Sequence, residues 1–362
     1  MKRNLFERSS ARRVVGALAA AAIGVCVAAG PAAAQLNPSY KKYSASQIAK
    51  IFDNGDIHVL PVQGNIYMIV AGDVNVVAQV GDDGILLVDT GKKELAEKLI
   101  ETIRLRFENK PIRFIINTSV RPEHTGGNET VVKFIRNRGL GSGGGTGGDG
   151  GGNNTFRLIA HETTSNRMNG LLPGETEAPA DALPTSTFFT EKKKIYFNNE
   201  PIEIISAPAA NTDGDLMVFF RGSDVIASGD VFRTDSYPVI DAKRGGTVQG
   251  TLDALNRILD ITVPEFNEQG GTRIIPGHGR LCNESDVDDY RNWMTIIKYR
   301  VEDMVKKGMT LDQVKAAKPS LDFDGVFAGN APYIEAAYQD LTTIAKAAPA
   351  AKAAPSRGGK TK

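Results

Sequence analysis

Cysteine is scarce in this sequence of 362 residues, which contains only Cys26 and Cys282. Cys26 lies in an N-terminal segment that we expect to be removed, so Cys282 would be the single cysteine of the mature chain. One cysteine excludes an intramolecular disulfide. The folded protein must then be stabilised by its hydrophobic core, for which roughly 300 residues are sufficient.

The sequence also lacks an apolar run long enough to span a membrane. The best candidate, within residues 1–34, falls short of the roughly 20 residues that a span requires. It follows the basic residues Lys2, Arg3, Arg8, Arg12 and Arg13 and ends in Pro31-Ala32-Ala33-Ala34, which is typical of a cleavable export signal. We therefore expect a periplasmic or secreted protein without a stable membrane span. Arg12-Arg13 leaves the twin-arginine route open, but the following residues match that pattern poorly, and the general secretory route is favoured at least as strongly.

Basic residues do not dominate the body of the chain, although the formal net charge is +1. Residues 1–34 carry five basic residues and one acid, and residues 346–362 carry five basic residues and no acid. The remaining body has 33 basic residues against 41 acidic ones, a net charge near −8. An acidic body repels a phosphate backbone, which excludes nucleic acid as a partner and leaves a small-molecule substrate or ligand as the expectation.

Two segments have a composition typical of disorder. Residues 139–154 contain two glycine triplets and predict a flexible insertion. A phosphate-binding loop is the alternative, but no Gly-Lys-Ser/Thr sequence closes the segment and no strand leads directly into it. Residues 346–362 are rich in Ala, Pro and Lys and predict a disordered tail. Residues 35–345 are expected to form one domain.

Apolar β-forming segments occur in two groups, each with amphipathic helical patterns beside it. The first group comprises residues 65–70, 74–80, 85–88 and 112–116, with a helix expected over 92–109. The second comprises residues 194–197, 202–206, 216–220, 225–227 and 273–275, with helices over 247–259, 284–307 and 333–345. Two β-rich halves with helices outside predict an α/β (α+β) domain built as a four-layer αβ/βα sandwich. Strand-end loops of both halves then meet at one edge, which would bring His124, Asp230 and His278 together.

A histidine-containing loop follows the strand expected at residues 112–116. Its sequence, Asn117-Thr118-Ser119-Val120-Arg121-Pro122-Glu123-His124-Thr125-Gly126-Gly127-Asn128, resembles the metallo-β-lactamase superfamily signature Asn-Thr-His-x-His-x-Asp-His-x-Gly-Gly-Asn. Four more segments occur in the order of that family: residues 84–90, residues 211–215, Ser228-Gly229-Asp230-Val231-Phe232 and Pro276-Gly277-His278-Gly279. The resemblance extends over residues 60–300 and is greatest to an exported, metallo-hydrolase-like branch of the superfamily. It implies the metallo-β-lactamase fold and a metal site.

The resemblance divides that site into two unequal halves. The three histidines that hold the first metal in the family are replaced by Ser119, Arg121 and Asn211. A hydroxyl, a guanidinium and an amide cannot replace neutral imidazoles around zinc, and Arg121 places a fixed positive charge there. We expect this half to bind no metal.

The positions of the second metal keep donor side chains. They become Glu123, His124, Asp230 and His278, which together could bind one zinc or another divalent cation such as manganese or iron. Glu123 is one methylene longer than the usual aspartate, a displacement of about 1.5 Å that is large against the ±0.2 Å tolerance of a metal site. The resemblance therefore implies at most one metal, and metal-free protein is the open alternative.

Two functions follow from this ligand set. In the first, a lone cation activates a water molecule for hydrolysis of a carbonyl, ester or phosphate group, and Arg121 and Asn211 position the oxyanion of the substrate. Glu123, Asp230, Arg121 and Asn211 are then the residues expected to carry the reaction. In the second, Arg121 balances Glu123 and Asp230 as an ion-pair network in place of a metal, and the protein is a non-catalytic periplasmic binding or scaffold protein. Hydrolysis of β-lactams themselves is possible but not favoured, because a fold does not specify a substrate.

Several residues near these segments receive structural interpretations. Asp89 is expected to orient the signature loop through hydrogen bonds, and Asp213 and Asp215 to shape a turn. His161 ends a strand and is interpreted as a structural or cleft-wall residue in preference to a ligand, and His58 as a surface or packing residue. Cys282 is expected to pack in the core. Phe188-Phe189 and Leu171-Leu172 predict either an apolar flap over the cleft or core packing beneath a long loop.

Overall fold

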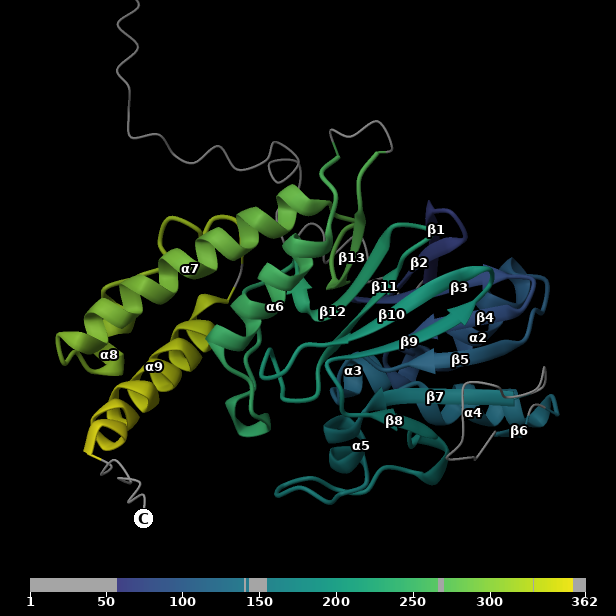
Figure 1. Ribbon diagram of the computed structural model, residues 1–362, viewed down its shortest axis with the longest axis horizontal. Helices are drawn as coiled ribbons and strands as arrows, with labels where there is room; N and C mark the ends of the chain where they lie inside the picture. The colour runs from purple at the N-terminus through teal and green to yellow at the C-terminus, as the bar shows by residue number, and fades with distance from the viewer. Residues whose placement is uncertain (1–56, 140, 143–154, 266–269, 328, 354–362) are drawn as a thin grey trace, which may run out of the picture.

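The computed structural model describes residues 57–139, 141–142, 155–265, 270–327 and 329–353 (Figure 1). The expected export signal, most of the expected glycine-rich insertion and residues 354–362 lie outside these ranges. Among the described helices, none is both long enough and apolar enough to cross a membrane.

The first sheet contains eight strands in the order β1-β2-β3-β4-β5-β7-β6, with β8 paired to β7. Strands β1 to β4 form an antiparallel meander, whereas β4, β5, β7 and β8 run parallel. The direction changes where helix α2 connects β4 to β5, since parallel neighbours need a crossover. The strands are β1 (Ile57–Gln63), β2 (Ile66–Ala71), β3 (Val74–Gly81), β4 (Gly84–Val88), β5 (Ile112–Ile116), β6 (Gly141–Ser142), β7 (Thr155–His161) and β8 (Ser186–Phe188).

The second sheet contains five strands in the order β13-β12-β11-β10-β9. Strands β9 to β12 are antiparallel to their neighbours, and β13 runs parallel to β12 after the crossover helix α6. Strand β11 is fully buried, as its unbroken apolar sequence predicts for a central strand. The strands are β9 (Lys192–Phe197), β10 (Glu200–Ser206), β11 (Leu216–Phe220), β12 (Val225–Arg233) and β13 (Arg273–His278).

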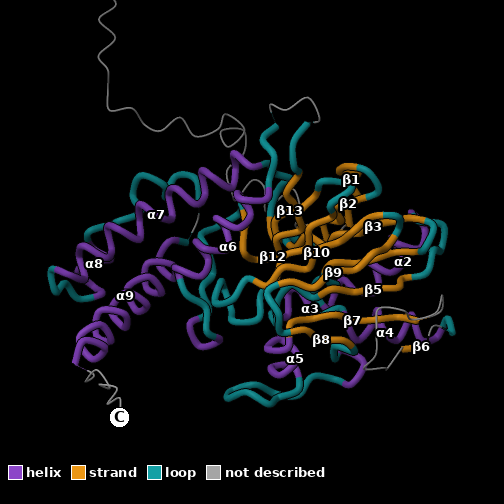
Figure 2. Tube along the Cα trace, viewed as in Figure 1, coloured by secondary structure: helices purple, strands orange, loops and turns teal. Residues whose placement is uncertain are grey.

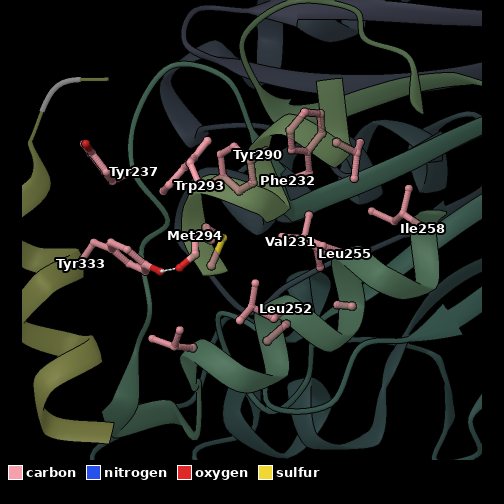
Figure 3. Close-up of a cluster of buried hydrophobic side chains, with 14 of the residues drawn as sticks. Val231, Phe232, Tyr237, Leu252, Leu255, Ile258, Tyr290, Trp293, Met294 and Tyr333 are labelled. Atoms are coloured by element: carbon pink, nitrogen blue, oxygen red, sulfur yellow. Dashed lines mark hydrogen bonds between the residues drawn. The ribbon is translucent and has the colours of Figure 1, made fainter. Parts of the chain in front are cut away.

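Helices cover the outer face of each sheet. A hydrophobic cluster joins α2 and α4 to the first sheet, and another joins α6, α7 and α9 to the second, where Trp293 and Tyr290 pack with Phe232 (Figure 3). A third cluster, which includes Leu86 and Val218, fills the space between the sheets. The layers confirm the predicted αβ/βα sandwich (Figure 2). The helices are α2 (Ala96–Arg106), α3 (Pro122–Thr125), α4 (Asn128–Asn137), α5 (Glu162–Met168), α6 (Val248–Ile261), α7 (Glu284–Lys306), α8 (Leu311–Ala316) and α9 (Asn330–Ala353), with short 3₁₀ turns η2 (Lys93–Leu95), η3 (Ala180–Ala182) and η4 (Ala242–Arg244).

The structure changes two of the predicted boundaries. Helix α9 continues to Ala353, so the first part of the segment predicted to be disordered is helical. The physical reason is its alanine content, because alanine has the highest helix propensity. Strand β12 continues to Arg233, well beyond the predicted end at Ala227, because it keeps pairing with β13 through two irregularities around Gly229.

Buried polar side chains join the two sheets. The amide nitrogen of Asn75, in β3, donates to the carbonyl oxygens of Pro276 and Gly279 at distances of 2.9 and 3.0 Å. These two acceptors flank His278 at the end of β13. The Asn75 amide therefore fixes the end of the second sheet to the first sheet at the edge where the candidate site lies.

Removal of the Asn75 amide is expected to weaken this connection. In Asn75→Ala, two buried carbonyl groups lose their donor, and we expect the free energy of unfolding to fall by about 2 to 3 kcal/mol. Urea unfolding monitored by Trp293 fluorescence measures this loss. Asn137→Ala, at the exposed end of α4, is the control and should change stability by less than about 0.5 kcal/mol. Equal stability of the two variants would contradict the assigned role of Asn75.

Candidate metal centre

The candidate site lies where strands of both sheets end. Asp89 follows β4, the signature loop follows β5, and Asp230 and His278 lie in the adjacent parallel strands β12 and β13. Gly229 has a φ of +53°, and a side chain at this position would collide with Thr118 of the signature loop. The glycine thus allows β12 to approach the loop closely enough for Asp230 to reach it.

Asp89 holds the signature loop in place, as the sequence predicted. Its carboxylate accepts hydrogen bonds from the Thr118 backbone nitrogen at 2.8 Å and from the Thr118 hydroxyl at 2.6 Å. It also lies 2.8 Å from Nδ1 of His124. A carboxylate that accepts from Nδ1 orients the imidazole and directs Nε2 towards the opposite side.

Three buried donors converge at the centre of the site. The Nε2 atoms of His124 and His278 lie 3.1 and 3.2 Å from the same atom, Oδ1 of Asp230. The candidate ligand atoms of these residues all lie within 4.8 Å of one another. His278 is oriented by the backbone carbonyl of Asp73, 2.7 Å from its Nδ1. The sequence predicted that these three residues lie together, as the structure shows, and their role as metal ligands stays a prediction. The sequence did not predict the contact with the Asp73 carbonyl, because every residue has a carbonyl group and its position leaves no sequence signal.

The geometry of this trio fits a cation. Nδ1 of each histidine faces an acceptor and must donate to it, so in the neutral imidazoles both Nε2 atoms carry lone pairs. These lone pairs face a carboxylate oxygen that is also an acceptor. Both Nε2 atoms and both carboxylate oxygens of Asp230 are buried and have no hydrogen bond of normal geometry among the described residues. Buried polar atoms without hydrogen bonds are costly, and a divalent cation among them would satisfy all three ligands.

The charges of His124 and Asp230 are strongly coupled. Burial alone would lower the pKa of His124, but the carboxylates of Asp230 and Asp89 raise it well above its ordinary value. Burial alone would raise the pKa of Asp230, but His124 and His278 lower it well below its ordinary value. The two groups thus favour each other's charged forms. A cation bound at Nε2 of His124 would compete with a proton there, since a metal ligand must be deprotonated.

Arg121 forms ion pairs with the two acidic residues predicted as ligands. Its Nε atom lies 2.9 Å from Oε1 of Glu123, and its Nη1 atom lies 3.0 Å from Oδ2 of Asp230. Arg121 therefore meets the oxygen of Asp230 that does not face the imidazoles. Glu123 is not part of the group of three convergent donors, and its role as a fourth ligand stays a prediction. With both imidazoles neutral, the carboxylates of Asp89, Glu123 and Asp230 exceed the guanidinium of Arg121 by two negative charges, which a divalent cation could balance.

Two residues in the half of the site predicted to bind no metal lie in the interior of the fold. Ser119 and Asn211 are fully buried. The amide nitrogen of Asn211 donates to the backbone carbonyl of Asp230, and its amide oxygen accepts from the hydroxyl of Thr251. Both polar atoms of Asn211 are thus engaged in holding the backbone around Asp230.

Beside Asn211, Asp215 shapes the turn, as expected. Its carboxylate accepts from the backbone nitrogens of Asn211 and Thr212, both at 2.8 Å. Burial raises the pKa of Asp215 to about 6, and the nearby charge of Asp230 acts in the same direction. Asp215 is therefore a buried acid that titrates near neutral pH.

An ion-pair network that the sequence did not predict lies beside the turn of residues 211–215. Arg167 in α5 binds both carboxylate oxygens of Asp213 and also contacts Glu175, which in turn binds Arg244. Arg244 pairs with Asp241 as well. The partners are far apart in sequence, so only the folded chain reveals the network. It connects the loop after α5 with the turn that carries Asn211.

The remaining single residues have simple environments. Cys282 is buried in the cluster that joins the second sheet to its helices, as expected, and His58 is exposed on β1. Phe188 is buried between the sheets, whereas Phe189 and Leu171 are largely exposed. His161 is half-buried at the end of β7, with its ring against Phe188.

Comparison with solved structures shows the same fold in two sec-alkylsulfatase structures. A double mutant of a sec-alkyl sulfatase aligns over 86% of this chain and 54% of its own, with 15% identity and a TM-score of 0.59. The stereoselective inverting sec-alkylsulfatase from a Pseudomonas species aligns over 83% and 54%, with 16% identity and a TM-score of 0.57. A metallo-β-lactamase from Pontibacter korlensis aligns over 66% and 99%, with 13% identity and a TM-score of 0.49. The chain spans about half the length of the alkylsulfatase structures.

Comparison of the sequence with protein families and with curated proteins finds no relative. Identities this low show a shared fold and nothing more about activity. The metallo-β-lactamase fold predicted from the signature segments is confirmed by the two sec-alkylsulfatase structures.

The raised pKa of Asp215 predicts that the stability of the protein depends on pH. Its pKa is about 6 in the folded protein and near 3.8 in the unfolded chain, so the folded protein holds the proton more tightly. This group's contribution to stability is complete below about pH 4 and is lost as the pH rises through 6. Between pH 4 and 7, the parent should lose about 2 kcal/mol more than Asp215→Asn, which cannot titrate.

Urea unfolding of both proteins over this pH range, in the presence of a chelator, measures the difference. The chelator ensures that no cation adds charge beside Asp230. Parallel pH profiles of the parent and Asp215→Asn would show that Asp215 does not titrate in this range.

Proposed function

We propose that this protein, which has the metallo-β-lactamase fold, is a hydrolase that uses one divalent cation bound by His124, Asp230 and His278. The proposal rests on one observation: two imidazole Nε2 atoms and a carboxylate oxygen are buried together without hydrogen bonds of normal geometry. With both imidazoles neutral, the surrounding side chains carry a surplus of two negative charges, and a divalent cation would balance this surplus.

The residues around the proposed cation site have different roles. A divalent cation on these ligands would supply Lewis acidity and make a water molecule in contact with it more acidic. His124 and His278 would hold it in a fixed direction, because Asp89 and the Asp73 carbonyl orient their rings. Asp230, whose Oδ1 faces both imidazoles, would be the third ligand, and its Oδ2 keeps Arg121 close to the same group of residues. Asn211 holds the backbone of Asp230 and acts as a positioning residue.

The substrate we propose carries an oxyanion or develops one during hydrolysis. Arg121 offers a permanent positive charge beside the three donors, and a guanidinium binds carboxylate, sulfate and phosphate groups well. Two of the structural neighbours are named as sec-alkylsulfatases, so sulfate esters are among the substrates to be tested. This chain spans only about half the length of those structures. Hydrolysis of β-lactams is not favoured, because the half of the site that bears Ser119, Arg121 and Asn211 lacks histidine.

A second function is favoured by the ion pairs themselves. Arg121 already bridges Glu123 and Asp230, so the guanidinium could replace the metal and leave a non-catalytic binding or scaffold protein. The two functions differ in what balances the carboxylates. In the hydrolase, the cation is the main balancing charge. In the binding protein, Arg121 is the main balancing charge.

We also propose that the protein acts after export, in the periplasm or outside the cell. The proposal rests on the basic, apolar and small-residue pattern of residues 1–34, which lie outside the described part of the chain.

Metal content tests the hydrolase directly. Protein purified without chelator should contain about one equivalent of zinc, manganese or iron by mass spectrometry. His278→Ala and Asp230→Ala each remove a ligand and should weaken cation binding by at least about tenfold. If Glu123 is a fourth ligand, Glu123→Ala will weaken binding similarly. His58→Ala, which removes an exposed histidine on β1, is the matched control and should keep the full cation content. A parent protein that binds none of these cations would rule out the hydrolase.

Arg121 separates the two functions. In a hydrolase, Arg121→Gln should keep about one equivalent of cation and lose roughly 100-fold in kcat/KM, because a charge that stabilises the oxyanion is removed. The assay uses 4-nitrophenyl acetate, phosphate and sulfate as chromogenic esters. In a metal-free binding protein, the same variant leaves two carboxylates unbalanced and should lose about 3 to 5 kcal/mol of stability.

The control for this experiment is Arg106→Gln, at the exposed end of α2. It should change neither activity nor stability. A cation-loaded Arg121→Gln protein that hydrolyses the esters as fast as the parent would contradict the role assigned to Arg121.

A further inference from the structure

His161 lies where three segments of the candidate site are joined by hydrogen bonds. The backbone nitrogen of Asn117, at the start of the signature loop, donates to the carbonyl of Ile159 in β7. The carbonyl of Thr118 accepts from the backbone nitrogen of Leu216, just after the turn of residues 211–215. The hydroxyl of Thr164, in the first turn of α5, donates to the carbonyl of Gly214 in the same turn. The end of β7 is thus held between the two segments that carry Arg121 and Asn211.

The strand register places His161 at the height of the signature loop. Ile116 pairs with Ile159 in parallel, so two residues further along, His161 in β7 is level with Thr118 beyond β5. The charge of Asp213 acts on the His161 imidazole, which is further evidence that the ring lies beside the turn of residues 211–215. His161 therefore borders the half of the site in which Ser119, Arg121 and Asn211 replace the family's histidines.

The two ring nitrogens of His161 have different environments. Nδ1 accepts a hydrogen bond from the backbone nitrogen of Thr163 at 3.2 Å, which places the proton of the neutral ring on Nε2. Nε2 has no hydrogen bond to any described residue, and it is not among the buried atoms without a partner. Among the described residues, the Nε2–H group therefore has no hydrogen-bond acceptor. Helix capping by Nδ1 explains why a histidine can stand here, but it leaves the Nε2–H group unused.

We propose that the Nε2–H group of His161 binds an oxyanion of the substrate, such as a sulfate, phosphate or carboxylate group, together with Arg121. This inference rests on the proposed hydrolase and assigns the unused half of its site. The ring can make this contact without gaining a charge, because Nδ1 is already an acceptor and Nε2 is already a donor. Burial lowers the pKa of His161, which favours the neutral ring with its proton on Nε2. The unused donor of His161 and the guanidinium of Arg121 together make this half an anion-binding half.

Binding of inorganic sulfate to the cation-loaded protein tests the assignment. The chain has only four histidines, so two-dimensional spectra of ¹⁵N-histidine-labelled protein can be assigned with single variants. We expect His161 to show a protonated Nε2 and an unprotonated Nδ1, and sulfate to shift the Nε2 resonance. In His161→Leu, the Kd for sulfate should rise about tenfold, because a hydrogen bond to a charged group is lost.

Two variants separate binding from structure. His161→Gln keeps a side-chain N–H donor and should restore the Kd for sulfate to within about threefold of the parent. His58→Leu, on the edge strand β1 far across the sheet from β7, should leave the Kd unchanged. Thermal unfolding of all three variants shows whether any of them has lost its fold.

The outcomes distinguish this inference from the proposed hydrolase. A parent that does not bind sulfate, or a His161→Leu protein that is folded and binds it as tightly as the parent, would overturn the assignment of His161. The metal content of the same samples reports separately on the hydrolase. A protein without metal whose sulfate binding still requires His161 would keep the anion site and lose the hydrolase.

Discussion

The carboxylate of Asp230 is the interaction on which the rest of the site depends. Its Oδ1 atom faces two imidazoles and its Oδ2 atom faces a guanidinium. The carboxylate and the imidazoles are buried, and Arg121 is partly buried with its Nη1 atom away from water. A buried carboxylate is stable only if the surrounding charges and hydrogen bonds replace its hydration. The Nε2 atoms of His124 and His278, the Nη1 atom of Arg121 and the amide of Asn211 all lie where they do because they surround this one residue and its backbone.

The same carboxylate explains why the substitutions in the signature loop are compatible with a folded protein. An arginine at position 121 would repel a cation in the adjacent half of the site, but it also neutralises Glu123 and one oxygen of Asp230. The other oxygen still faces the imidazoles. One carboxylate thus meets two imidazoles on one side and a guanidinium on the other, which is the arrangement on which the proposed cation and anion contacts rest.

The sequence predicted the architecture because the fold depends on local patterns. Strands β5 and β11 were predicted to the residue, since each is an unbroken apolar run between polar or turn residues. The continuation of β12 depends on pairing with β13, a tertiary contact that no local pattern contains. Within the site, His124, Asp230 and His278 were identified through the family resemblance, not through their spacing, because they are separated by many residues. The orientation of His278 by the Asp73 carbonyl and the pairing of Glu123 with Arg121 require coordinates.

The hydrogen bonds of Asn75 have a consequence for the order of events in the cell. His124 belongs to the first sheet and His278 to the second, and Asn75 fastens the second to the first beside His278. No compact set of three ligands exists until the halves have docked, so a nascent or unfolded chain cannot select a cation through this site. For the proposed cation site, the compartment in which the halves dock would also supply the ion, and its metal pool, more than the intrinsic preference of the ligands, would decide which element binds.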